Sequence, residues 1–451
     1  MQQPDVPNIE CPDDSATAPR SALLIVFLVV FIDLLGFGIV LPLLPLYASY
    51  LLTPLFPDRP DYVGGMLAVL MASFSFMQFL FAPIWGRISD RLGRRPILII
   101  GLAGSVVFYA LFAYASHLGF AGEEGWGVGL ILLSRIGAGV AGATIATAQA
   151  VIADCTGPAE RSRGMALIGA AFGIGFTFGP LLCFASFFVE SKAAPGAAAA
   201  LLSLIALVLA IVLLPETLRP GVGGGRRHWL KFNTLAEVLR MPTIGALVIT
   251  FFLATVAFGS LEATLALMNQ YLLSDGGTVR RLHEMSVEEL DDIFRKSSLI
   301  FAYVGLTLML VQGLIYRRLV MRVGELRFMR LGTFLMVVGL LGVIALVLAV
   351  AAGRLRGTHQ TIPVALAILL VLVGGFALMT PSVQALISKR ADPTRQGEIL
   401  GANQSAAALA RILGPAIGSW LFFASPSHVL PYSVGVVLMT VVFGLTLRLR
   451  D

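Results

Sequence analysis

Charge is scarce along this chain. Only 13% of its residues are Asp, Glu, Lys or Arg, about half of the roughly 25% that is usual in soluble proteins. Hydrophobic residues make up 57% and the mean hydropathy is +0.87. The apolar residues gather in blocks close to the ~20 residues that a helix needs to cross a bilayer. This composition excludes a soluble globular protein and predicts a polytopic protein whose surroundings are the lipid bilayer.

Cysteine and histidine are also scarce. The three cysteines, Cys11, Cys155 and Cys183, are too widely spaced to predict a metal site or a disulfide framework. The five histidines form no paired motif. The Walker loop GxxxxGKS/T of ATP-driven proteins is missing, as is the GxSxG of serine hydrolases. We therefore expect no metal, no cofactor and no enzymatic activity.

The apolar blocks number twelve and predict an all-α membrane fold. They cover residues 21–48, 62–86, 95–117, 126–152, 162–189, 197–214, 243–273, 297–320, 328–352, 361–388, 398–423 and 428–447. With the N-terminus inside, the inside segments hold 22 basic residues and the outside segments hold 8. This bias predicts that both termini are cytoplasmic. Because the basic residues are confined to the short connections, the net charge of +6 does not predict a nucleic-acid partner.

The connections divide the chain into two halves. Residues 1–20 carry four acids and one arginine, the wrong charge for a secretory signal peptide, and we expect a disordered cytoplasmic tail. Six spans then form a bundle over 21–214, and six more form a bundle over 242–451. The linker 215–241 is rich in glycine and basic residues, as a flexible cytoplasmic connector requires. We expect a monomer in the cell membrane, with an organelle membrane as the alternative.

An internal repeat relates the halves. Residues 147–180 align without gaps with 382–415 at a shift of 235, which pairs Gln149 with Gln384 and Gly179-Pro180 with Gly414-Pro415. Two parallel repeats of six spans are a transporter architecture, with the substrate site between the repeats near the membrane midplane.

Four motifs carry a resemblance to a known family. They are GRISDRLGRRP at Gly86–Pro96, DLLGFGIVLPLLPLY from Asp33, LLSRIGAGVAGATIA around Arg135 and GIGFTFGPLL from Gly173. With these motifs the whole chain resembles a major facilitator superfamily transporter, in particular the drug/proton antiporters of the tetracycline-exporter type and their animal relatives. The resemblance implies a twelve-helix fold in two pseudo-symmetric halves and transport by alternating access. It also identifies Gly175, Gly179 and Pro180 as the antiporter motif of the fifth helix.

Four ionisable residues, Asp33, Arg135, Glu262 and Arg411, fall well inside predicted spans. A charge there is costly and usually functional. Asp33 and Glu262 are 229 residues apart, close to the repeat shift, so we expect equivalent places at a central cavity. Such carboxyl groups bind and release protons as their surroundings change. The resemblance places Arg135 beside Asp33, where it would tune that acid. We assign Asp33, Arg135 and Glu262 to proton coupling, with permanent ion pairs or helix contacts as the alternative.

A second group of residues is assigned to the substrate. Arg411 in the eleventh span would bind an anionic group, or would merely snorkel or pair with a carbonyl. Gln149 and Gln384 are candidates through the repeat, while many other polar residues only join helices. The full set of predicted substrate residues is Arg411, Gln149, Gln384, Phe37 and Asn269.

Residues Gly86–Pro96, hereafter the charged segment, hold four arginines and one aspartate. Anchoring alone does not require the aspartate, because the second half keeps a worn copy, RRLVMRVGELR at 317–327, without it. Asp90 would suit the positive N-terminus of a helix from the other half, and the resemblance points to the eleventh. We interpret the segment as a conformational gate formed by Gly86, Asp90, Arg91, Gly93 and Arg94.

These assignments favour proton-coupled efflux of an apolar or amphiphilic small molecule. One alternative is a uniporter or symporter of an organic anion or lipid-like solute. Arg411 favours it, as does Cys183-Phe184 where the resembled antiporters have glycines. The other alternative is a receptor or scaffold that transports nothing, against which the charges inside the membrane argue.

Overall fold

The computed structural model is built of helices. It describes residues 26–28, 30–32, 34–35, 38, 51–52, 54–56, 60–157, 159–186, 191–218, 234–273, 287–355, 358–424 and 427–449. Within these residues every regular element is helical, which confirms the predicted all-α class. The described positions of the first predicted span, between 26 and 38, are helical too.

The helices follow the predicted spans closely. The first half contains α2 (Pro60–Leu92), α3 (Arg94–Phe120), α4 (Glu124–Ala141), η1 (Gly142–Thr144), α5 (Ile145–Cys155), α6 (Arg161–Ser186) and α7 (Ala194–Leu213). The short helix α8 (Thr234–Leu239) lies in the predicted linker. The second half contains α9 (Pro242–Leu273), α10 (Val287–Leu310), η3 (Val311–Tyr316), α11 (Arg317–Val323), α12 (Glu325–Ala351), α13 (Thr358–Arg390), η4 (Pro393–Arg395), α14 (Gln396–Ala424) and α15 (Leu430–Arg448).

Ten stretches of the described chain are long and apolar enough to cross a membrane. They correspond to ten of the twelve predicted spans. Of the remaining two, 21–48 lies mostly outside the described residues, and 162–189 corresponds to α6. Large apolar side chains such as Leu201 and Val212 of α7 are well exposed, as expected for a surface that faces lipid.

Two spans are interrupted by a change of helix type. The 3-10 turn η1 separates α4 from α5 at Gly142, and the π-helical η3 separates α10 from α11. Such changes break the regular backbone ladder and recur at functional sites. The sequence pattern predicted neither interruption, because the apolar residues continue through both.

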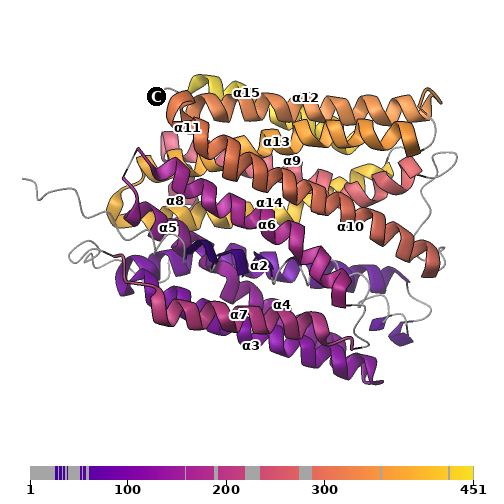
Figure 1. Cartoon of the computed structure of the whole chain (residues 1–451), viewed down its shortest axis with the longest axis horizontal. Helices are drawn as coiled ribbons and strands as arrows, with labels where there is room; N and C mark the ends of the chain where they lie inside the picture. Colours follow the sequence, from indigo (N-terminus) through magenta and orange to yellow (C-terminus); the bar gives the residue numbers. More distant parts are fainter. Residues whose placement is uncertain are drawn as a thin grey trace, which may run out of the picture.

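The helices run side by side, with α3, α4 and α7 of the first half at the bottom of the view and α12, α13 and α15 of the second half at the top (Figure 1). Helix α14 packs against α2 of the first half as well as α9 of its own half, and α10 packs against α6. A glycine allows α6 and α10 to approach closely, because a Cβ on Gly173 of α6 would lie 2.5 Å from the backbone nitrogen of Met309 in α10. The halves therefore meet along two seams, α2–α14 and α6–α10.

Candidate functional site

The charged segment belongs mainly to helices rather than to a loop. Helix α2 continues to Leu92 and α3 begins at Arg94, so only Gly93 lies between them. Gly93 has a φ of 107°, a conformation that glycine adopts without strain. The sharp bend places the last turn of α2 against the beginning of α14, and this contact is the centre of the candidate site.

Asp90 lies at the N-terminus of α14, across the α2–α14 seam. Its Oδ1 accepts a hydrogen bond of 2.9 Å from the backbone N–H of Gly397, and its Oδ2 accepts one of 2.8 Å from that of Glu398. The first amides of a helix have no partner within the helix and carry partial positive charge, so they favour a carboxylate. Asp90 is 6% exposed, so water screens the contact only weakly.

Arg94 holds the Asp90 carboxylate from its own half. Its Nη1 lies 2.5 Å from Asp90 Oδ1, and its Nε lies 3.0 Å from Oδ2 of Asp154 at the end of α5. Arg94 is 1% exposed. Two carboxylates thus surround one buried guanidinium, as a buried charge requires.

A second ion pair crosses the seam beside Asp90. Arg87 of α2 donates to Glu398 of α14 at 2.9 Å and also to the hydroxyl of Thr234 in α8. The other oxygen of Glu398 accepts from Arg395 at 2.9 Å. Arg395 in turn lies 3.7 Å from Glu237 of α8. The end of the predicted linker therefore contacts the same cluster that joins the two halves.

Close backbone packing accompanies these charges. A Cβ on Gly86 would overlap the carbonyl oxygen of Gly397, and a Cβ on Gly397 would lie 2.5 Å from the carbonyl oxygen of Gly86. Only residues without a side chain allow the two backbones to meet here. This contact gives Gly86 a physical role in the seam.

Glu216, just beyond α7, caps α3 behind the charged segment. Its two carboxylate oxygens accept from the backbone N–H groups of Arg94 at 2.8 Å and Arg95 at 3.1 Å. A Cβ on Gly93 would overlap this carboxylate. Glu216 could not be identified from the sequence, because nothing in its spacing relates it to a segment about 120 residues earlier.

The worn copy in the second half contains a related ion pair with reversed charges. A shift of 231 residues aligns the charged segment with the worn copy at 317–327. In this alignment Gly93 corresponds to Gly324, which also has a positive φ, and Arg94 corresponds to Glu325. At the shift of 235 Asp154 corresponds to Lys389. Glu325 and Lys389 are 2.5 Å apart, so the two halves form the same pair with opposite polarity.

The α2–α14 seam continues from the charged segment toward the middle of the membrane. A Cβ on Gly401 would lie 2.7 Å from the carbonyl oxygen of Ala82. Farther along, Ser405 donates to the carbonyl of Phe79 at 2.6 Å, and Arg411 donates to Oε1 of Gln78 at 2.9 Å. The seam therefore includes polar contacts beyond the charged segment, which apolar periodicity did not predict.

Several of the charges predicted inside the membrane lie near this seam. Arg135 of α4 is 1% exposed, and its guanidinium lies 4.6 Å from the ring centre of Phe74 in α2, one turn before Gln78. Glu262 lies on α9, which packs against α14, the helix that contains Arg411. Asp33 and Phe37 lie outside the described residues. For Asn269, only its place in α9 is described.

The other predicted residues divide between the helices. Gln149 and Gln384 are both buried, in α5 and α13. A Cβ on Gly175 or Gly179 of α6 would contact the first span at Leu34 and Gly38 respectively. The predicted antiporter motif thus packs closely against the span that contains Asp33. Pro180 is described only as a position in α6, and Arg91 occupies the last turn of α2.

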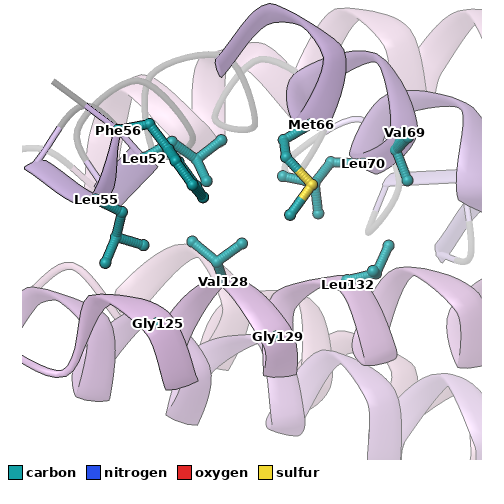
Figure 2. A pocket seen from close by; sticks show the side chains of 10 residues that line it. All are labelled: Leu52, Leu55, Phe56, Met66, Val69, Leu70, Gly125, Val128, Gly129 and Leu132. Atoms are coloured by element: carbon teal, nitrogen blue, oxygen red, sulfur yellow. The ribbon is translucent and has the colours of Figure 1, made fainter. Parts of the chain in front are cut away.

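An apolar pocket of about 370 Å³ lies elsewhere in the first half (Figure 2). Residues of α2 and α4 line it together with Leu52, Leu55 and Phe56, and all of them are apolar. None of the predicted site residues contributes to it. We therefore place the candidate site at the α2–α14 seam rather than in this pocket.

Comparison with known proteins gives the family. The model of the Major Facilitator Superfamily matches residues 26–280 and 287–451. The chain belongs to the major facilitator superfamily. Among its relatives, tetracycline resistance protein class C of Escherichia coli is 30% identical over 94% of this chain and 95% of its own length. Major facilitator superfamily domain-containing protein 10 of Bos taurus is 28% identical over 95% of this chain and 93% of its own length.

Experimental structures of major facilitators have the same fold. That of the human organic anion transporter MFSD10 (TETRAN) superposes with a TM-score of 0.74 at 25% identity, covering 95% of this chain and 99% of that one. That of the proton:xylose symporter XylE superposes with a TM-score of 0.69 at 17% identity, which shows the fold alone. This major facilitator is thus a multi-pass membrane transporter of small molecules and not an enzyme, and the resemblance found in its sequence is confirmed.

Proposed function

We propose that this major facilitator exports an apolar or amphiphilic organic molecule by alternating access, and that protons moving inward drive the export. The observation that carries the proposal is the contact between Asp90 and the first amides of α14. It joins the halves through directional hydrogen bonds at one end of the α2–α14 seam. Such a contact suits a reversible motion of two rigid bodies, because it breaks completely over a small displacement.

We propose that Gly86, Asp90, Arg91, Gly93 and Arg94 act together as the conformational gate. The close packing of Gly86 on Gly397 and the buried pair of Arg94 with Asp90 support this role. The gate is closed when Asp90 binds α14 and opens when that bond breaks. The basic residues of the charged segment also support a cytoplasmic location for this end and for both termini. We retain the predicted boundaries of the tail, the two bundles and the linker, and a monomeric state.

We assign proton coupling to Asp33, Arg135 and Glu262. The burial of Arg135, whose guanidinium lies 4.6 Å from the ring centre of Phe74, supports an electrostatic role for that residue. Gly175 and Gly179 allow α6 to pack closely against the first span, which contains Asp33. A movement of α6 would therefore displace that span. The proposed substrate residues remain Arg411, Gln149, Gln384, Phe37 and Asn269.

Transport in proteoliposomes tests this function. The purified chain is reconstituted with a pH-sensitive dye inside the vesicles, and tetracycline is the first probe because relatives are tetracycline resistance proteins. We expect tetracycline movement to be accompanied by opposite proton movement, and both to be abolished in Asp33→Asn. If tetracycline and a broad panel of other apolar drugs are moved without protons, or not at all, proton-coupled efflux is wrong.

A second candidate is transport of an organic anion without proton coupling. The position of Arg411, a cation inside the membrane region, favours it, and one structural relative is an organic anion transporter. Carboxyfluorescein is a suitable probe. An uncoupled carrier would keep its carboxyfluorescein flux in Asp33→Asn, whereas a proton-coupled one would lose it. Absence of any flux and of any thermal shift with either probe would favour a receptor or scaffold.

A further inference from the structure

Gln78 of α2 is buried at the seam, and both ends of its carboxamide are hydrogen-bonded. It is 5% exposed. Its Nε2 donates to the carbonyl of Gly142 at 3.1 Å, and its Oε1 accepts from Arg411 at 2.9 Å. One bond stays within the first half and the other crosses to the second half. The side chain therefore connects a structural feature of one half to a charge of the other.

The bond to Gly142 lies at the interruption between α4 and α5. The change of helix type alters the regular hydrogen-bond ladder there, and α2 supplies side-chain donors to carbonyls at this place. Trp85 donates to the carbonyl of Val140 at 2.8 Å, and Gln78 donates to Gly142. With its amide nitrogen engaged in the first half, Gln78 presents its oxygen, an acceptor, toward α14.

Arg411 donates to Gln78, a neutral acceptor that belongs to the first half. Glu262 is a carboxylate of its own half, on α9, which packs against α14. If the halves separate along the α2–α14 seam, Gln78 moves away with α2 while Glu262 stays with α9 and α14. The bond between Gln78 and Arg411 therefore exists only while the seam is closed.

We propose that Gln78 is a positioning residue that holds the Arg411 guanidinium at the seam in the closed state and releases it, when the seam opens, to Glu262 and to an acidic group of the transported molecule. This inference rests on the alternating access proposed above. In this scheme Arg411 can bind an anion in the open state, and its bond to Gln78 prevents this in the closed state. Gln78 thereby links the opening of the seam to a change at the substrate residues.

Two substitutions at Gln78 act in opposite directions. Gln78→Met is similar in length but accepts no bond from Arg411, so the seam should open more readily. Gln78→Glu keeps the acceptor and adds a negative charge, so it should hold Arg411 more tightly. The measurement is the rate at which a hydrophilic maleimide modifies Ser405→Cys, a seam position, in a chain whose native cysteines are replaced by serine. We expect about a tenfold faster rate in Gln78→Met, as for loss of a bond to a charged group, and a slower rate in Gln78→Glu.

Two further variants separate positioning from a general structural role. In an Arg411→Met background, Gln78→Met should change the rate no further, because both substitutions remove the same bond. Trp85→Phe is the matched control, since it removes the neighbouring donor to the interruption without touching Arg411. Equal effects of Gln78→Met with and without Arg411, or the same effect from Trp85→Phe, would overturn the proposal.

The design also separates this inference from the function on which it rests. If Asp90→Asn and Gln78→Met both leave the modification rate unchanged, the seam does not open and alternating access at this place is wrong. If Asp90→Asn raises the rate and Gln78→Met does not, the gate stands and the role of Gln78 is wrong.

Discussion

Replacing Asp90 by asparagine keeps the shape of the side chain but removes its charge. Three donors bond to the Asp90 carboxylate: the amides of Gly397 and Glu398, and the guanidinium of Arg94. Asparagine offers one oxygen, so its amide nitrogen must face a donor. A hydrogen bond to a charged group contributes about 1.5–3 kcal/mol, and Arg94 keeps Asp154 as a partner. We therefore expect the closed state to lose about 2–4 kcal/mol relative to the open state.

This loss corresponds to a change of roughly 30- to 700-fold in the ratio of closed to open states, at 1.4 kcal/mol per tenfold. The assay is maleimide modification of Ser405→Cys in the chain with its native cysteines replaced. While the closed state dominates, the rate of modification follows the open population. Ser116→Cys in α3 is the control, because Ser116 is equally buried but bonds to Phe112 within one helix.

Turnover should slow in Asp90→Asn, because the closed state forms less often. Affinity for substrate within each state should stay nearly unchanged, since Asp90 lies at the end of the seam away from the proposed substrate residues. An unchanged modification rate together with a lower affinity would refute the gate. Faster modification at both Ser405→Cys and Ser116→Cys would show general unfolding, and would refute the reasoning that the effect is confined to the seam.

Three further substitutions test other parts of the site. Glu216→Ala removes the cap of α3 and should lower stability by about 1–2 kcal/mol, measured as a lower Tm. Glu123→Ala, at the uncapped start of α4, should have little effect, and equal shifts in Tm for the two variants would contradict the cap. Gly86→Ala should abolish transport, because the added Cβ forces α2 away from α14. Gly374→Ala, whose added Cβ meets no atom within 4 Å, should be tolerated. Normal transport by Gly86→Ala would contradict the close approach of the two helices. Glu325→Lys and Lys389→Glu should each lower the Tm, and the double variant should recover much of the loss; purely additive losses would show that the pair does not contribute.

The sequence was most informative where local chemistry limits the choice of partners. The apolar blocks predicted the helices because spanning a bilayer requires ~20 apolar residues. Asp90 was predicted to bind a helix N-terminus for two reasons. Anchoring in the membrane does not require a carboxylate in the charged segment, and a carboxylate suits the free backbone amides at a helix N-terminus. In the structure Asp90 accepts from Gly397 and Glu398 at the beginning of α14.

The partners across the seam could not be predicted in the same way. Gln78 was one polar residue among several, and nothing in its spacing relates it to Arg411, 333 residues later. Glu216 likewise contacts the charged segment only after α7 returns to it. Such pairs depend on how whole helices pack, and a single sequence holds no periodic signal for that. The repeat shifts relate the pair of Glu325 and Lys389 to Arg94 and Asp154, but only after the structure has shown that Arg94 and Asp154 pair.

The reversed polarity of these two pairs limits how the halves can exchange parts. A chimera that carried residues 91–96 in place of 322–327 would set an arginine beside Lys389, and the reciprocal chimera would set a glutamate beside Asp154. Each would bring like charges together at the point where two helices are joined. The smallest unit that can be transplanted between the halves therefore includes both the turn and the end of the facing helix.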